Sequence, residues 1–316
     1  NSPGKDITVQ IMSKIRPYFA PVVGIRQLVN TVTATARACG TATGPLFNGN
    51  AIVALTPGGI GFNAVGTANW KVEGGGIFSN SSDRWSARCV GNTDVSAPSV
   101  TVVGDLNLRC RGASIDTQTT GATQYQYADY SQLLPRAPAC NGTARQQGTF
   151  WVAQAGADGS RVSFNGGDMR FAPGLYCVTN SPGPYHGNIT GTWVTFYIVP
   201  SNFNLKFNGG GSLTAIAPLY GEYTGVLMFS RAILSGGTLQ QTQSIDLRGN
   251  GTGDVSGSII VPSASVTMYG NSNSNGYETQ VIAHDVNSGG NADIYISYHA
   301  NKGFQSFFPA WLTLLR

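Results

Sequence analysis

The sequence contains little charge. Only 11% of its 316 residues are Asp, Glu, Lys or Arg, and the net charge is +4. The basic residues are scattered along the chain, so it carries no electrostatic footprint for nucleic acid, and we expect no nucleic-acid partner. A surface with so few charges must be covered by uncharged polar groups. That composition is more typical of secreted, wall-associated and fibrous proteins than of cytoplasmic enzymes.

Long apolar runs are also missing. None approaches the roughly 18 residues that a membrane-spanning helix needs. The chain begins neither with methionine nor with a signal peptide. We therefore expect a processed or partial product that starts downstream of the segment that exported it.

Patterns typical of catalysis and metal binding are absent too. The 15 acidic residues occur singly, whereas glycoside hydrolysis needs two neighbouring carboxylates. The sequence contains no CxxC pair, only three histidines, and neither a nucleophile elbow nor a phosphate loop. The closest constellation is His284 and Asp285 with Asp293 and His299, which turn-capping carboxylates and surface histidines explain more simply. We expect no enzymatic activity, no metal and no cofactor.

What the sequence does have is glycine, 42 residues of it, between many short alternating segments. These segments recur from about Ala51 to Tyr298, separated by Gly-Asn and Gly-Gly turns, with almost no helical periodicity. This pattern predicts a mostly β protein, a right-handed parallel β-helix (solenoid) built of stacked rungs. The predicted strands are Ala51–Leu55, Ser99–Val103, Val162–Phe164, Trp193–Val199, Asn204–Phe207, Ser212–Ala215, Gly225–Phe229, Gly257–Val261, Ser265–Met268 and Ala292–Ile296.

Three regions follow from the pattern. Residues 1–38 form a small strand-helix-strand module, with alternating strands on either side of an apolar turn or helical turn at Pro17–Gly24. Residues 39–300 form the β-helix, in which Ala113–Gln147 is expected to be a polar surface excursion, with a ligand-binding loop as the alternative. Residues 301–316 form an apolar C-terminal strand or tail that docks on its own fold or on a neighbouring subunit.

Five cysteines fit two disulfides and one remaining thiol in a secreted protein. We prefer the pairs Cys89 with Cys110 and Cys140 with Cys177, because each would close one or two rungs. The remaining thiol is then Cys39, either free or bonded to another subunit.

Several segments occur in a recognisable order along the chain: Ile7–Arg37 with Tyr18–Ile25 between its strands, Asn50–Pro57, Val72–Ser82, Pro173–Cys177, Val194–Ile198, Ala215–Pro218, Gly225–Phe229 and Gly257–Ser265. In this order they resemble the TadG-like proteins of bacterial Flp (Tad) pilus assembly. The likeness spans nearly the whole chain and rests on the order of its segments. Two departures are the missing membrane helix and rungs that stray from the usual Ser-Gly-Asn pattern. The resemblance implies an extracytoplasmic β-helix region that follows an upstream membrane helix, absent here.

These observations favour a non-enzymatic structural protein of the bacterial surface. We expect an extracellular, self-assembling subunit of a filament or tube, or a component associated with a Tad pilus. Its partners would be copies of itself and other pilus or cell-envelope components. Apolar residues near both termini are the candidate subunit contacts, so deletion of Phe307–Arg316 should leave a folded monomer that does not assemble. The candidates are Ile7, Val9, Ile11, Tyr18, Phe19, Phe307, Phe308, Trp311 and Leu314.

Two alternatives stay open. The first is a carbohydrate-binding or carbohydrate-active β-helix, which requires that tryptophans among Trp70, Trp85, Trp151 and Trp193 line an outer face. The second is a monomeric, membrane-tethered pilus-assembly factor, which requires a retained membrane helix just upstream of Asn1.

Overall fold

The computed structural model shows a β-solenoid of about 10 turns, mostly parallel, as the sequence predicts. The structure describes residues 5–18, 24, 27–39, 41–208, 210–248, 255–270, 276–289, 293–309 and 311–315. For residues 5, 38, 39 and 311–315 it describes the backbone alone. The chain divides into two compact units. One comprises Asn1–Gly44 with Phe307–Arg316, and the other comprises Pro45–Ser306.

The first unit contains an antiparallel hairpin. Strands β1 (Lys5–Ile15) and β2 (Leu28–Cys39) pair over their full described length, and β29 (Trp311–Leu315) pairs with the end of β2. The helical turn expected at Pro17–Gly24 lies mostly outside the described residues, as does Phe19. Strands β3 (Ala42–Pro45) and β28 (Gln305–Phe308) form a separate two-stranded sheet.

The second unit is the solenoid. Its first part contains η2 (Leu46–Gly49), β4 (Ile52–Ala54), β5 (Phe62–Gly66), β6 (Trp70–Glu73), β7 (Ile77–Ser79), β8 (Ala87–Val102) and β9 (Leu106–Thr119). A connector then holds α1 (Tyr127–Tyr130) and η3 (Ser131–Leu133). The second part contains β10 (Gly142–Thr143), β11 (Arg145–Gln147), β12 (Phe150–Val152), β13 (Ser160–Val162), β14 (Met169–Phe171), β15 (Gly174–Val178), β16 (Gly183–Tyr185), β17 (Asn188–Thr192), β18 (Val194–Ile198), β19 (Asn204–Phe207), β20 (Ser212–Ile216), β21 (Val226–Ser230), β22 (Leu234–Ser235), β23 (Thr238–Leu239), β24 (Gln243–Arg248), β25 (Val255–Tyr269), β26 (Tyr277–Gly289) and β27 (Ile294–Ser297).

Parallel pairing arranges these strands in three faces. Face A stacks β10, β13, β15, β18 and β21 on the middle of β25 and β26, and then β4, β7 and the end of β8. Face B stacks β16, β19 and β24 on the later parts of β25 and β26, and then β5, β8 and β9. Face C stacks β12, β14, β17 and β20 on the starts of β25 and β26, and then β27, β6, β8 and β9.

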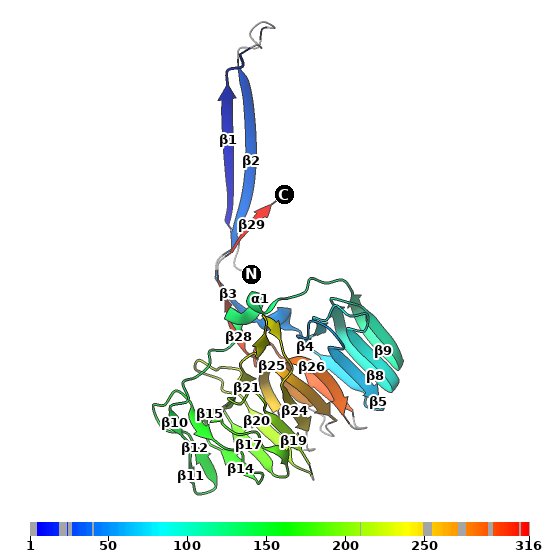
Figure 1. The fold of residues 1–316 in the computed structure, drawn as a ribbon, viewed down its shortest axis with the longest axis vertical. Helices are drawn as coiled ribbons and strands as arrows, with labels where there is room; N and C mark the ends of the chain where they lie inside the picture. Colours follow the sequence, from blue (N-terminus) through cyan, green and yellow to red (C-terminus); the bar gives the residue numbers. More distant parts are fainter. Residues whose placement is uncertain are drawn as a thin grey trace. The chain divides into compact units, whose positions relative to one another are not determined.

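The rungs are not stacked in chain order. The first strand, β4, pairs with β26 near the end of the chain, so that Ile52 lies opposite Val281. Strand β6 likewise pairs with β27, with Val72 opposite Ile296. Along the axis the solenoid therefore runs from residue 142 to residue 298 and continues from residue 51 to residue 119. Figure 1 shows this seam, where the orange β26 lies between β25 and the blue strands β4 and β5.

Side-chain hydrogen bonds also join the two parts of the solenoid at this seam, where β26 and β27 pair with β4 and β6. The Gln280 amide donates hydrogen bonds to the carbonyl oxygens of Leu46 (3.1 Å) and Asn50 (2.8 Å). On face C, the Asn69 amide donates to the Asp293 carboxylate at 2.8 Å. The two halves are thus joined by backbone pairing and by a buried polar side chain that contacts both.

The connector between the halves covers the outside of face A. Tyr125, Tyr130 and Leu133 pack on the outward-facing side chains of face A, including Phe78 and Ile282. The stretch Ala113–Gln147 therefore differs from the polar excursion that we expected, because it begins within β9 and continues as a packed strap. Its placement explains why β18 and β21 are buried on both sides.

A separate cluster fills the interior of the solenoid. Phe164, Phe171, Tyr176 and Phe196 form one part of it, and the rings of Phe171 and Phe196 lie 5.0 Å apart in an edge-on arrangement. Inward-facing residues of neighbouring rungs stack on one another, so each rung depends chiefly on the rungs directly above and below it.

Two disulfides are present, and they join the pairs that the sequence suggested. Cys89 and Cys110 link β8 to β9, and Cys140 and Cys177 link the end of the connector to β15. Disulfides persist in oxidising compartments, so both bonds fit a protein outside the cytoplasm. Cys39 lies at the end of β2, and its side chain is not among those described.

Candidate functional site

The hairpin of β1 and β2 presents one apolar face. Side chains alternate along a strand, and Ile7, Val9 and Ile11 lie on the same face, opposite Ala36, Ala34 and Val32. Ile11 is 65% exposed and Val32 is 57% exposed. Isoleucine side chains are seldom left this far in water when a core can receive them. The apolar face comprises Ile7, Val9, Ile11, Ile15, Leu28, Val32, Ala34 and Ala36.

The other face of the hairpin is mostly polar, although Met12 and Val29 also lie on it. Arg37 donates hydrogen bonds to both carboxylate oxygens of Asp6, at 2.7 and 3.0 Å, and this contact lowers the pKa of Asp6. The hydroxyl groups of Thr8 and Thr35 hydrogen bond across the strands at 3.0 Å. The two-stranded ribbon is therefore amphipathic, with its charged pair on the face opposite the isoleucines.

The hairpin also has open edges. In the sheet β1-β2-β29, β1 is an edge strand, and β29 pairs only with Thr35–Cys39 of β2. Unpaired backbone groups along an edge are a template for another strand. The β1–β2 hairpin therefore combines an exposed apolar face with open strand edges.

The remaining contact candidates lie close to this element or on the C-terminal strands. Tyr18 is 96% exposed beyond the end of β1, and Phe307 is exposed in β28 while Phe308 is half-buried. Within β29, Trp311 lies opposite Cys39 and Leu314 opposite Ala36. The structure thus brings Ile7, Val9 and Ile11 together on one face and places the strand that holds Trp311 and Leu314 beside β2.

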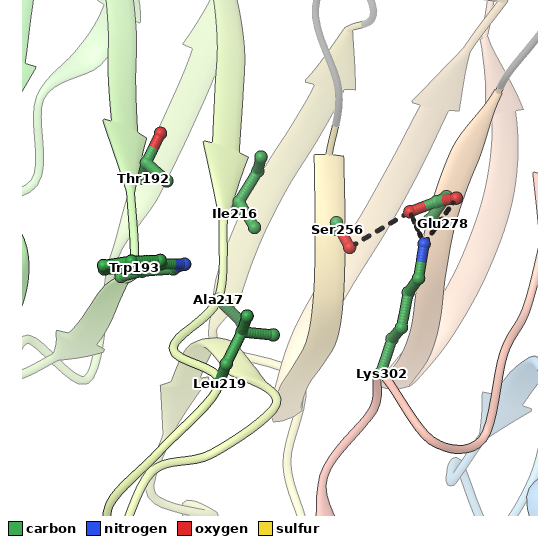
Figure 2. A pocket seen from close by; sticks show the side chains of 8 residues that line it. All are labelled: Thr192, Trp193, Ile216, Ala217, Leu219, Ser256, Glu278 and Lys302. Atoms are coloured by element: carbon green, nitrogen blue, oxygen red, sulfur yellow. Dashed lines mark hydrogen bonds and ion pairs between the residues drawn. The ribbon is translucent and has the colours of Figure 1, made fainter.

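A second candidate is a groove on the solenoid at the edge of face C. Three adjoining hollows, of about 460, 680 and 450 Å³, form this groove. The first and second share Thr192 and Ile216, and the first and third share Trp193 and Leu219. We call this feature the Trp193 groove, because Trp193 lines both the first and the third hollow. Figure 2 shows the residues that line the first hollow.

Outward-facing side chains of consecutive strands form its floor. Strand pairing aligns Arg170 with Thr190 and Thr190 with Thr214. A second row aligns Thr192 with Ile216 and continues through Ser256 to Glu278. Neighbouring strands lie about 4.8 Å apart, so each row is a ladder with that repeat.

Trp193 stands out by its backbone. It joins β17 to β18 with a φ of +59°, in the left-handed region that a bulky residue seldom adopts. Such a conformation costs about 1–3 kcal/mol, and strain of this kind clusters at functional sites. The residue is 47% exposed, so packing of the indole does not offset this cost fully.

An ion pair lies at the end of the first hollow away from Trp193 (Figure 2). The Lys302 ammonium donates to both oxygens of Glu278, at 3.0 and 2.9 Å, and the Ser256 hydroxyl donates to Glu278 at 3.3 Å. In the third hollow, Arg136 binds Glu222 and thereby lowers the pKa of that carboxyl group. Both carboxylates of the groove are therefore neutralised by cations.

The four tryptophans singled out in the sequence have different surroundings. Trp70 is buried in the interior, and Trp151 is partly buried and packs against the interior cluster. Trp85 is 40% exposed, with the Arg84 guanidinium 4.4 Å from its ring centre. Of these four, Trp193 is the one that lines the groove.

The acid-histidine constellation has a structural explanation. His284 Nδ1 lies 3.1 Å from Asp285 Oδ2, and Asp285 also accepts hydrogen bonds from Ser265 and Asn287. Asp293 instead accepts from Asn69 on face C. Across the described residues, no group of three or more His, Cys, Asp or Glu side chains could hold a metal ion. No helix in the described part of the chain is both long and apolar enough to span a bilayer.

Comparison with models of protein families found no match, and comparisons with curated proteins and with solved structures found none either.

Proposed function

We propose that this protein is a non-enzymatic structural protein of the bacterial surface that assembles with copies of itself through the β1–β2 hairpin. The observation that carries the proposal is the exposed apolar face of that hairpin. Burial of apolar surface stabilises by about 25 cal/mol per Å². A second copy is the occupant that fits, because an identical ribbon offers both an apolar face and an open edge of the same length.

Charge placement supports the same occupant. From Ile7 to Ile15 and from Leu28 to Ala36, the apolar face carries no Asp, Glu, Lys or Arg, while Asp6 and Arg37 form their ion pair on the opposite face. Two apolar faces can therefore pack together without burying a charge, which would be costly. Assembly of this kind yields a closed pair when the contact is isologous, and a ring or a filament when it is heterologous, according to whether the rotation between subunits closes.

The cellular setting is part of the proposal. Two disulfides, a low content of charge and the resemblance to TadG-like proteins favour an extracellular protein associated with a Tad-type pilus or a related appendage.

Two lysine substitutions test the proposal on adjacent residues. Ile11→Lys places a charge on the apolar face, and Gln10→Lys places the same charge on the polar face of the same strand. Light scattering coupled to size exclusion, with negative-stain microscopy, should show assemblies for the natural chain and for Gln10→Lys. Ile11→Lys should give monomers with an unchanged melting temperature of the solenoid.

Three results would count against self-assembly. The natural chain could be monomeric at all concentrations, both lysine variants could assemble equally, or the natural chain could bind lipid vesicles through the hairpin while staying monomeric. A Cys39→Ser variant separates contacts made by the hairpin from any bond made by Cys39, because it removes only the latter, whereas a reducing agent would also break Cys89–Cys110 and Cys140–Cys177.

A further inference from the structure

We propose that the Trp193 groove binds an extended oligosaccharide, with the Trp193 indole as the stacking platform for one sugar ring. This site lies on the solenoid and is independent of assembly through the hairpin. The proposal rests on four features of the groove: the adjoining hollows, the regular spacing of side chains on successive strands, the position of Trp193 and the charge of the lining.

The length of the groove and the spacing of its side chains fit an oligosaccharide. Since the three hollows share lining residues, they adjoin one another, and a ligand several units long can reach from one into the next. The rows through Thr190 and Thr192 cross consecutive strands with a repeat of about 4.8 Å. That repeat is close to the length of one pyranose unit in an extended chain, so successive sugars meet successive rungs.

The lining offers the contacts that a sugar ring uses. The face of an indole is negative, and the carbon-bound hydrogens on one face of a pyranose are weakly positive, so the two faces pack together. In the first and second hollows, the hydroxyl groups of Thr192, Thr190 and Thr214 can donate to and accept from sugar hydroxyl groups. Apolar contact comes from Leu219 and Ile216, beside the indole (Figure 2).

The backbone of Trp193 supports a binding role for this residue. A position with φ +59° accepts glycine or asparagine with little strain, yet it holds the bulkiest side chain. The half-exposed indole lines the groove, whereas an indole that only filled the core would not need this strained backbone position.

Other occupants fit less well. A peptide cannot add a strand here, because β14, β17 and β20 already have a partner on both sides. A nucleic acid needs several cations for its phosphates. Within the described residues, the Trp193 groove has Arg170 as a cation without an ion pair, while Lys302 is bound to Glu278.

Affinity electrophoresis of the full chain tests the proposal. The gels contain a neutral β-linked glucan, a polyuronate or no polymer, and titration of tryptophan fluorescence with the corresponding oligosaccharides gives the dissociation constant. We expect the natural chain to be retarded by at least one polymer. Trp193→Ala should weaken binding at least tenfold, and Trp193→Phe should retain part of it.

The chain offers a matched control. Trp85→Ala removes an indole of similar exposure outside the groove and should bind as the natural chain does. Thr192→Lys fills the junction of the first two hollows from an exposed position and should weaken binding without unfolding the solenoid. Ile11→Lys should bind normally, so failure of assembly and failure of glycan binding are separate results.

Several outcomes would overturn the proposal. One is absence of binding to both polymers and their oligosaccharides. Another is equal loss in Trp193→Ala and Trp85→Ala. A third is binding to the polyuronate alone that disappears with salt and with Arg170→Ala while Trp193→Ala has no effect, since this would show attraction by charge without stacking.

Discussion

The solenoid and the hairpin use the same alternating pattern and treat their apolar side chains in opposite ways. Ile52 in β4 is fully buried, whereas Ile11 in β1 is 65% exposed. A strand inside the solenoid has a neighbour on each side and a filled interior beneath it. Among the described residues, no second sheet layer packs on the hairpin. Beyond the stretch Thr35–Cys39 that pairs with β29, it is a two-stranded ribbon, which is marginal in water. Alternation therefore indicates a strand with an apolar face but does not say which molecule covers that face.

The largest expected difference comes from truncating one apolar side chain in each region. Phe196→Ala should lower the free energy of unfolding by about 3–5 kcal/mol, because it removes a fully buried ring that contacts Phe171, Phe164 and Tyr176. Ile11→Ala in the hairpin should change it by less than about 0.5 kcal/mol. Urea denaturation under conditions that keep the protein monomeric measures both. Equal losses would mean that the hairpin face is covered within the monomer.

The next largest effect compares the two disulfides of the solenoid. Removal of the Cys140–Cys177 bond by a double substitution with alanine should cost about 2–4 kcal/mol, because the bond restricts the unfolded chain. Cys89–Cys110 closes a shorter segment, 21 residues compared with 37, and its loss should cost less. Thermal unfolding of the two double variants shows which disulfide contributes more to stability. Assembly through the hairpin should be unchanged in both variants and serves as the control. The reverse order would mean that native contacts around the bonds dominate over chain entropy.

The seam provides a third and smaller effect. Gln280→Ala leaves the carbonyl oxygens of Leu46 and Asn50 without the amide that now donates to them, at a cost of about 1–3 kcal/mol. Hydrogen exchange should show faster opening of β4 and β26 than of β14 and β17. Gln241→Ala is a suitable control, since that side chain donates only to the nearby Gln243 carbonyl. Uniform loss of protection along the solenoid would show that the seam does not open separately.

Much of this fold could be predicted from local pattern. The alternation in Ser212–Ala215 and Ser265–Met268 locates strands β20 and β25, and the glycine-rich turns between such strands indicate rungs. The stacking order could not be predicted, because alternation says nothing about which strand lies next to β4. Its neighbour β26 is more than 200 residues away. The strap around Tyr130 was hidden for a related reason, since its apolar residues follow no period.

The candidate sites divide in the same way. The apolar face of β1 could be predicted from Ile7, Val9 and Ile11, because a strand directs every second side chain to the same side. The Trp193 groove could not, because it is built from rungs that are distant in sequence and because a tryptophan in an apolar run usually fills a core. The positive φ of Trp193 was the informative feature, and it is visible only in the structure.

The smallest expected effect compares one carboxyl group in each region through pH. Burial in the solenoid raises the pKa of Asp246, although Arg248 and Lys206 oppose this, whereas the contact with Arg37 lowers the pKa of Asp6 in the hairpin. A raised pKa means that the folded state favours the protonated form. Asp246 therefore destabilises the fold when it is ionised, and this cost is relieved as pH falls through its raised pKa toward the ordinary value of 3.8. Asp246→Asn should thus stabilise the protein slightly at pH 7 and lose that advantage below about pH 4.

Asp6→Asn should do the opposite: it should destabilise the protein at neutral pH, since the stability from Asp6 is present above pH 3.8 and is lost as pH falls through its lowered pKa. Urea denaturation of both variants at a series of pH values tests the signs, and a destabilised Asp246→Asn at pH 7 would show that the neighbouring cations outweigh burial.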